Sequence, residues 1–130
     1  MTQPQPSTDA SRSTRPLLPS AQVHPTVNAA MASFHRDVVD EVAQAVARDE
    51  WVLVGMATNP FVGRARKLLQ SEGITFTELR YGGYASKWKE RLAIKMWAGF
   101  PTFPMVFRKG VLLGGASELS AMQKAGTLKD

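Results

Sequence analysis

Two groups of residues in this sequence have types and spacings that suit the binding of anions. Arg91 and Lys95 are four positions apart, so on a helix they share one face, and a guanidinium can hold a carboxylate through two parallel hydrogen bonds. Gly114 and Gly115 precede Ser117, which can begin a helix whose unpaired backbone N–H groups attract a carboxylate. Each group also has a plainer explanation, because exposed basic residues are usually solvated, as we favour for Lys95, and paired glycines commonly end a hairpin.

The sequence contains no cysteine in its 130 residues. This excludes disulfide bonds, thiolate metal sites, iron–sulfur clusters held by the protein's own cysteines, and any cysteine nucleophile. The two histidines, His24 and His35, have no ligand-like spacing, so we expect no zinc site. No set of serine, histidine and aspartate and no pair of carboxylates converges either, which makes an enzyme of different chemistry the least favoured interpretation.

Charge and composition indicate a globular domain of ordinary size. Lys and Arg number 16 against 11 Asp and Glu, and 44% of the residues are hydrophobic. The net charge of +5 is modest and the basic residues are dispersed, so we expect no binding to nucleic acid. The longest apolar run, residues 51–57, is too short for a secretory signal or a membrane span. We therefore expect no membrane partner and a cytoplasmic location.

The first 33 residues differ in composition from the rest. They are rich in proline, serine, threonine, glutamine and alanine, without a sustained apolar period. Arg12 and Arg15 among serines faintly resemble a transit peptide, but no amphipathic pattern accompanies them. We expect residues 1–33 to form a disordered N-terminal tail and residues 34–130 to form the folded domain.

Helix and strand patterns alternate along the domain. Apolar residues recur at spacings near four in some segments, and short apolar runs bounded by glycine mark others. The expected elements are a helix at 34–47, a strand buried on both faces at 51–54, a helix at 64–71, a strand at 74–79, a helix at 86–98, a hairpin of 105–107 with 111–113, and a helix at 117–124. A right-handed crossover can place the second strand parallel to the first. This order predicts an α/β protein of the thioredoxin-like type, three-layer α/β/α with a mixed four-stranded sheet.

Three motifs stand in order on these elements. The most specific joins Arg91-x-x-Ile94-Lys95 to residues 100–104 (Phe-Pro-Thr-Phe-Pro), the second is residues 114–119 (Gly-Gly-Ala-Ser-Glu-Leu), and the third is residues 59–62 (Asn-Pro-Phe-Val). Together they resemble the glutaredoxin family, and within it the monothiol, iron–sulfur-related branch. The resemblance covers nearly all of residues 34–130, which we expect to be a glutaredoxin-like domain.

Pro104 follows an apolar residue in a tight bend at the start of a strand. Because X-Pro bonds adopt the cis form at small cost, Phe103–Pro104 is a candidate for a cis peptide. The plainer explanation is that Pro101 and Pro104 end a helix and shape a turn. The resemblance implies the cis form, and a groove in which the Phe103 backbone pairs with the cysteinyl unit of glutathione. The glutathione-binding residues that the resemblance implies are Arg91, Thr102, Phe103, Pro104, Gly115, Ala116 and Ser117.

Two positions in this groove depart from the family's pattern. Ser117 stands where the family has aspartate, which removes an acidic partner for the ammonium of the ligand unless Glu118 replaces it. Met56 stands where the family keeps a lysine that contacts a ligand carboxylate, so the carboxylate clamp is weakened. The γ-glutamyl carboxylate would be held at residues 115–117, and the other carboxylate by Arg91.

The resemblance breaks at the reactive position. Asn59 and Val62 occupy the family's two cysteine positions. Asparagine has no ionisable group near neutral pH, so it can neither attack a disulfide nor join glutathione in ligating a shared [2Fe–2S] cluster. We therefore expect no catalytic residue, no thiol–disulfide oxidoreductase activity and no iron–sulfur cluster.

Binding is the function that these residues leave open. We predict a glutaredoxin-like protein that lacks the catalytic cysteine and serves as a non-catalytic module for glutathione or a γ-glutamyl peptide. The alternative is a protein-interaction adaptor of the glutaredoxin and iron–sulfur network without a ligand of its own. Such an adaptor would dock its protein partner on the surface around Asn59, Phe61 and Phe103.

Overall fold

The structure, a computed structural model, describes residues 15–130 and divides into two units, Met1–Ser33 and Phe34–Asp130. The first unit contains a short 3-10 helix, η1 (Ser20–Gln22), and helix α1 (Pro25–Ser33), where the sequence predicted a disordered tail. Proline at the first helical position and an alanine-rich interior favour this helix locally. None of its side chains is buried, which explains why the sequence shows no apolar period there. The prediction for residues 1–14 lies outside the described residues.

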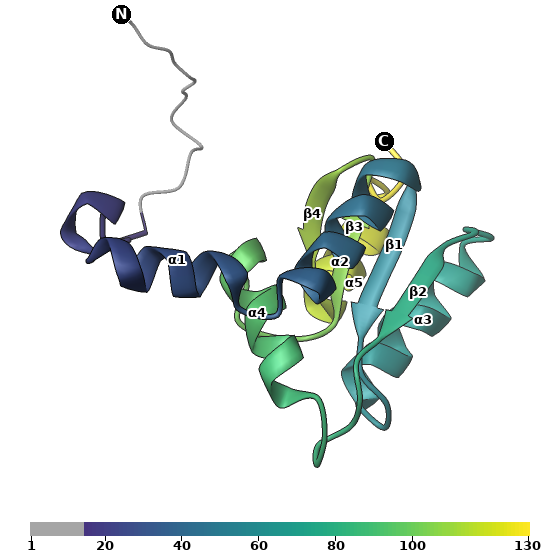
Figure 1. The fold of residues 1–130 in the computed structure, drawn as a ribbon. Coiled ribbons are helices and arrows are strands. Elements are labelled where there is room, and N and C mark those ends of the chain that lie inside the picture. Colours follow the sequence, from purple (N-terminus) through teal and green to yellow (C-terminus); the bar gives the residue numbers. More distant parts are fainter. Residues whose placement is uncertain (1–14) are drawn as a thin grey trace, which may run out of the picture. The chain divides into compact units, whose positions relative to one another are not determined.

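The second unit is built on a mixed four-stranded sheet in the order β2-β1-β3-β4 (Figure 1). Strand β1 (Trp51–Gly55) is parallel to β2 (Thr77–Arg80) and antiparallel to β3 (Met105–Arg108). Strand β3 pairs antiparallel with β4 (Val111–Gly114) in the expected hairpin. The sheet order and directions confirm the predicted α/β fold of the thioredoxin-like type.

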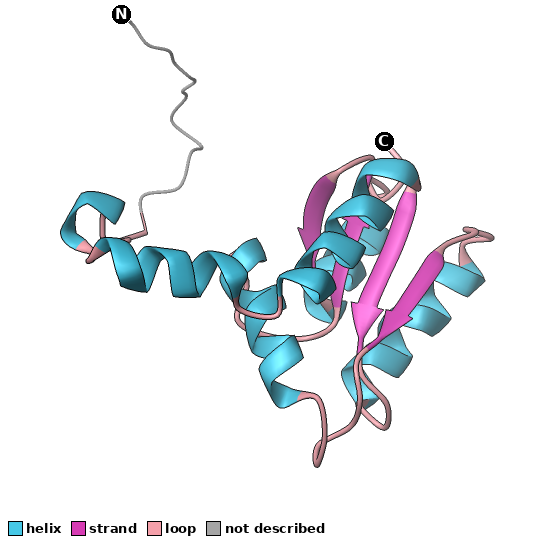
Figure 2. Ribbon diagram, in the orientation of Figure 1, coloured by secondary structure: helices cyan, strands magenta, loops and turns pink. Residues whose placement is uncertain are grey.

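Helices cover both faces of this sheet (Figure 2). They are α2 (Arg36–Arg48), α3 (Pro60–Ser71), α4 (Trp88–Ala98) and α5 (Ala116–Ala125). The alternation of side chains along β1 builds two cores, because Val52 and Val54 pack with α2 and α4 whereas Trp51 and Leu53 pack with α3 and α5. Every residue of β1 is buried, which confirms the expectation of a strand covered on both faces.

Two elements begin three or more residues from their predicted starts. Helix α3 begins at Pro60, four residues before the predicted start, because a capping side chain and a proline at the first position start it early. Strand β2 begins at Thr77 rather than at residue 74. The N–H of Ile74 donates to the carbonyl of Leu69 at 3.0 Å, so the helix end and not the sheet holds this segment. No helix within residues 15–130 is long and apolar enough to cross a membrane.

Candidate functional site

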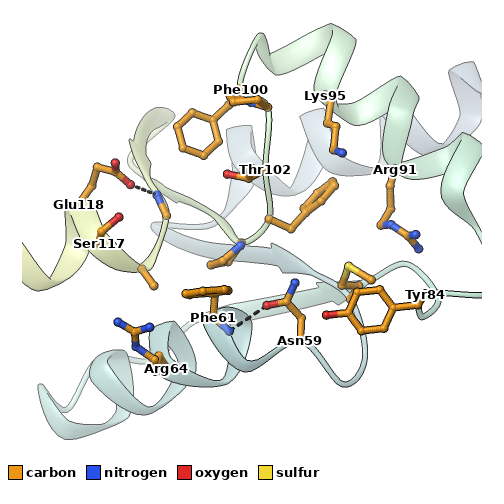
Figure 3. A pocket seen from close by; sticks show the side chains of 16 residues that line it. Asn59, Phe61, Arg64, Tyr84, Arg91, Lys95, Phe100, Thr102, Ser117 and Glu118 are labelled. Carbon is orange, nitrogen blue, oxygen red and sulfur yellow. Dashed lines mark hydrogen bonds between the residues drawn. The ribbon is translucent and has the colours of Figure 1, made fainter.

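A pocket of about 560 Å³ lies where the carboxyl end of β1, the start of α3, one side of α4, the loop 99–104 and the start of α5 meet (Figure 3). Its volume lies in the range of sites that bind small molecules. The residues that the sequence singled out for ligand binding all line it: Arg91, Thr102, Phe103, Pro104, Gly115, Ala116 and Ser117. Asn59 lines it as well.

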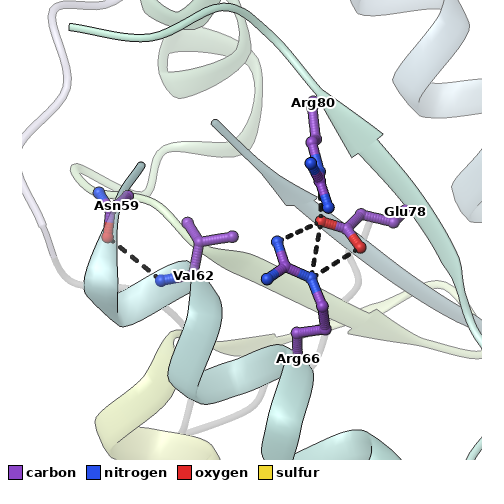
Figure 4. Close-up of polar contacts among 5 residues, drawn as sticks. All are labelled: Asn59, Val62, Arg66, Glu78 and Arg80. Carbon is purple, nitrogen blue, oxygen red and sulfur yellow. Dashed lines mark hydrogen bonds and ion pairs between the residues drawn. The ribbon is translucent and has the colours of Figure 1, made fainter. Parts of the chain in front are cut away.

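Asn59 is the N-cap of α3. Its Oδ1 accepts hydrogen bonds from the N–H of Phe61 at 2.8 Å and the N–H of Val62 at 3.1 Å, and Pro60 occupies the first helical position (Figure 4). The cap satisfies two of the N–H groups that a helix start leaves unpaired. The Nδ2 of Asn59 makes no hydrogen bond to any described residue. An amide therefore stands at the positive end of a helix dipole, where it accepts hydrogen bonds without carrying charge.

Val62 is a core residue and not part of the pocket wall. Its side chain is fully buried, and it belongs to the core that α2 and α4 form with the sheet. A Cβ at Gly55 would lie 2.8 Å and 2.9 Å from the two methyl groups of Val62, so only glycine leaves room for this close approach. Position 62 is thus closed to solvent and ligand.

The loop before β3 supplies the middle of the pocket. The Phe103–Pro104 peptide is cis, as the sequence predicted. The N–H and C=O of Phe103 join none of the main-chain hydrogen bonds among residues 15–130. The Phe103 ring is buried, and the Nζ of Lys95 lies 5.7 Å from its centroid. A ligand with a peptide group can pair with these main-chain groups.

The start of α5 offers fewer free donors than the sequence suggested. The N–H of Gly115 donates to Oε1 of Glu118 at 2.7 Å, so this donor is already satisfied. The N–H groups of Ala116 and Ser117 have no acceptor within the described part of the chain. Sequence reasoning grouped residues 115–117 together, and it could not show that Glu118 turns back onto Gly115. The donors left for a carboxylate are those of Ala116 and Ser117.

Arg91 is more buried than a solvated basic residue. Its side chain lines the pocket, and the residue is 8% exposed. Its Nη1 donates to the carbonyl of Tyr81 at 2.8 Å and to that of Ser86 at 2.6 Å, which ties the loop between β2 and α4. The remaining guanidinium nitrogens are not engaged by described residues. Arg91 therefore both holds the loop and can meet an anion.

Tyr81 extends this network beneath the pocket. Its hydroxyl donates to a carboxylate oxygen of Glu41 on α2. Burial, and then the hydrogen bond to Glu41, raise the pKa of Tyr81 above its ordinary value, so the phenol stays protonated at neutral pH. The hydrogen bond from the phenol anchors Tyr81, and the backbone carbonyl of Tyr81 in turn accepts a hydrogen bond from Arg91.

An ion-pair group ties α3 to β2 close to the Asn59 cap (Figure 4). The Glu78 carboxylate accepts from Nε and Nη2 of Arg66, at 2.7 Å for the shortest contact, and from Nε of Arg80 at 2.8 Å. The hydrogen bonds from Arg66, and then those from Arg80, lower the pKa of Glu78 below its ordinary value against the opposing effect of burial. The contact between Glu78 and Arg66 stabilises α3, the helix that begins after Asn59.

Cations outnumber carboxylates around the pocket. Arg64, Arg91 and Lys95 line it, and Glu118 is the one carboxylate among its described lining residues. The pocket therefore favours an anionic ligand. Within residues 15–130, no group of three or more carboxylate or imidazole side chains is placed to hold a metal ion.

Sequence reasoning missed two aromatic residues of the pocket. Tyr84 and Phe100 line it, and Tyr84 is 70% exposed. The only signal for Tyr84 is its place directly after Gly82 and Gly83, in a loop whose course the sequence does not specify. Phe100 could have been included because it opens the loop that the sequence did single out.

Comparisons with known proteins agree with this architecture. A scan against models of protein families finds no match. The chain is 44% identical over 96 residues to the glutaredoxin-like protein of Dictyostelium discoideum, covering 74% of this chain and 78% of the relative. It is 35% identical over 71 residues to glutaredoxin 3 of Escherichia coli (strain K12), covering 55% of this chain and 82% of the relative. The structure of a buckwheat glutaredoxin–glutathione complex superposes with a TM-score of 0.64 at 19% identity, covering 74% of this chain and 87% of the other, which is a likeness of fold.

Proposed function

Since this chain belongs to the glutaredoxin family, we propose that it is a non-catalytic member whose pocket binds glutathione or a γ-glutamyl peptide without reacting with it. The observation that carries the proposal is the pairing of an intact pocket with Asn59 at the position of the nucleophile. All of the expected binding residues line the pocket, while the residue at its reactive centre is a helix-capping amide.

The charges of the pocket suit this ligand class. Glutathione carries a carboxylate at each end and one ammonium group, so its net charge at neutral pH is negative. Arg91 and Lys95 lie on one side of the pocket and Ser117 on the other (Figure 3), and the N–H groups of Ala116 and Ser117 are unpaired among the described residues. Glu118 Oε2 makes no hydrogen bond to a described residue and can accept from an ammonium group. The buckwheat protein of the same fold, seen in complex with glutathione, supports the assignment of the ligand.

Thiol chemistry requires a group that this chain lacks. Thiol–disulfide exchange begins with attack by a thiolate on a disulfide sulfur, and no residue of the sequence can supply a thiolate. The donors around the pocket also do not fit a [2Fe–2S] cluster held with glutathione, because Asn59 offers a neutral amide whose oxygen already caps α3. The proposed activity is therefore binding alone.

A second candidate function is an adaptor for a protein partner. The observation that favours it is Phe61, which is 52% exposed beside the pocket with the Arg64 guanidinium 5.2 Å from its ring centroid. Exposed aromatic and arginine side chains are enriched where proteins bind one another. Affinity capture with the full chain tests it. A specific partner that is lost in Arg64→Glu supports the adaptor function, and a partner set unaffected by Arg64→Glu contradicts it.

Calorimetric titration of the full chain with reduced glutathione tests the primary proposal. We expect saturable heat at millimolar ligand or below, with one ligand bound per chain. An assay of glutathione-dependent disulfide reduction, run in parallel, should show no turnover above the uncatalysed rate. Absence of heat at millimolar glutathione would contradict the proposal.

A further inference from the structure

We infer that the pocket selects thioether conjugates of glutathione, whose sulfur carries an apolar or aromatic substituent, over free glutathione. This inference rests on the proposed function and names the ligand class within it. It concerns the part of the pocket between Asn59, Phe61 and Tyr84, which we call the aromatic mouth.

The placement of the anchors directs the middle of a ligand toward this mouth. The proposed carboxylate-binding ends are Ser117 on α5 and Arg91 on α4, and Figure 3 shows Thr102, the residue before Phe103, between them. Figure 3 shows Asn59 and Phe61 below Thr102. An extended ligand that spans the two ends and pairs with the Phe103 main chain has its central residue between Phe103 and Asn59. The side chain of that residue then faces the aromatic mouth.

The aromatic mouth exposes apolar surface that a small thiol does not cover. Phe61 is 52% exposed and Tyr84 is 70% exposed, and both line the pocket. The Arg64 guanidinium lies 5.2 Å from the centroid of the Phe61 ring, which holds the ring at the rim. A substituent on the ligand sulfur that lies against these rings removes apolar area from water on both partners.

The Asn59 side chain itself offers no ionic partner to the ligand sulfur. Its Oδ1 is committed to the N–H groups of Phe61 and Val62, and its amide is neutral at every ordinary pH. A free thiol therefore gains no ionic partner there, and a neutral thioether loses none. Because the chain has no cysteine, binding to this site is wholly non-covalent, and apolar contact is the main source of extra affinity that it offers.

The test compares ligands that share the tripeptide and differ at the sulfur. Calorimetry with the full chain measures the dissociation constants of reduced glutathione and of S-benzylglutathione. We expect S-benzylglutathione to bind about tenfold more tightly. Phe61→Ala should reduce this ratio to about two, because it removes half of the mouth. Trp88→Ala is the matched control: Trp88 is 58% exposed and does not line the pocket, so the ratio should stay near ten.

Each outcome separates the inference from the function on which it rests. Equal affinities for the two ligands, or binding of glutathione without binding of S-benzylglutathione, would overturn the inference and leave the proposed function standing. If neither ligand binds, the proposed function fails as well. If N-acetyl-S-benzylcysteine, which lacks the γ-glutamyl and glycyl parts, binds as tightly as S-benzylglutathione, the ring alone drives binding and the inference is overturned.

Discussion

Oδ1 of Asn59 accepts a hydrogen bond from the N–H of Val62 at 3.1 Å, which joins the two positions that the sequence resemblance matches to the cysteines of the family. The contact is a helix cap, and Val62 at its other end is fully buried in the core. Both positions have thus taken structural roles: the first starts α3, and the second fills the space above Gly55. The same residue, Asn59, therefore caps α3 and leaves the start of this helix without a thiol.

Removal of the cap should destabilise the protein. We expect Asn59→Ala to lower the free energy of unfolding by about 1 kcal/mol, because two N–H groups of the first turn lose their acceptor. Asn59→Asp is the control, since its carboxylate can cap and is favoured at a helix start, and it should stay within about 0.5 kcal/mol of the parent. Urea denaturation measures both. Equal stability of Asn59→Ala and the parent would contradict the capping role.

A cysteine should be reactive at position 59 and inert at position 62. Asn59→Cys places a thiol at the start of α3, where the helix dipole lowers the pKa of a cysteine. Position 59 also lines the pocket. Val62→Cys places one in the core. We expect iodoacetamide to modify Asn59→Cys at least about tenfold faster than Val62→Cys in the folded protein. Mass spectrometry follows both reactions, and similar rates for the two variants would show that the pocket is not arranged as described.

The N–H of Ala116 can be removed with little cost to the fold. Ala116 is the first residue of α5, where proline is well tolerated because that N–H has no partner in the helix. We expect Ala116→Pro to remain within about 0.5 kcal/mol of the parent in stability and to bind glutathione roughly tenfold more weakly, since one charge-assisted hydrogen bond is lost. Ala116→Gly keeps the donor and should bind like the parent. Unchanged affinity in Ala116→Pro would place the ligand carboxylate elsewhere.

The Glu78 group should make stability depend on pH in the acid range. The pKa of Glu78 is lower in the folded protein than in the unfolded chain. The contribution of Glu78 to the free energy of unfolding is therefore complete above the unfolded pKa and is lost as pH falls through the folded pKa. We expect Glu78→Gln to cost about 1 kcal/mol at neutral pH and to approach the parent in stability as the pH falls through the folded pKa of Glu78. Asp40→Asn, in the exposed pair with Arg36, should change stability by less than about 0.5 kcal/mol. Denaturation at several pH values measures both, and a pH-independent difference between Glu78→Gln and the parent would be the contrary result.

Much of the fold could be predicted from local patterns. The run of apolar residues in β1 indicated a strand buried on both faces, and the structure buries all of it. Residues 100–104 indicated the bend before β3 and made Phe103–Pro104 a candidate for a cis bond, and the family resemblance implied the cis form that the structure has. Helix α1 was missed because its residues form a helix through local preference and bury no side chain, which leaves no apolar period to detect.

The sequence predicted part of the membership of the candidate site, without Tyr84 and Phe100, and none of its hydrogen bonds. Sequence motifs brought Arg91 and residues 115–117 to one pocket, and the structure places them there. The motifs could not show that Glu118 accepts a hydrogen bond from the N–H of Gly115. They also could not show that one nitrogen of Arg91 donates to the carbonyls of Tyr81 and Ser86. Such contacts depend on rotamers and loop paths that a pattern of residue types does not specify.

The central claim, that this pocket binds glutathione without reacting with it, is tested most directly by nuclear magnetic resonance. The amide signals of the full chain are followed during titration with reduced glutathione. We predict saturable, reversible shifts at Phe103, Ala116 and Ser117, which line the pocket and whose N–H groups have no partner in the described chain, and no change in protein mass. Amide signals that stay unmoved at millimolar glutathione, or shifts confined to residues far from the pocket, would contradict the account.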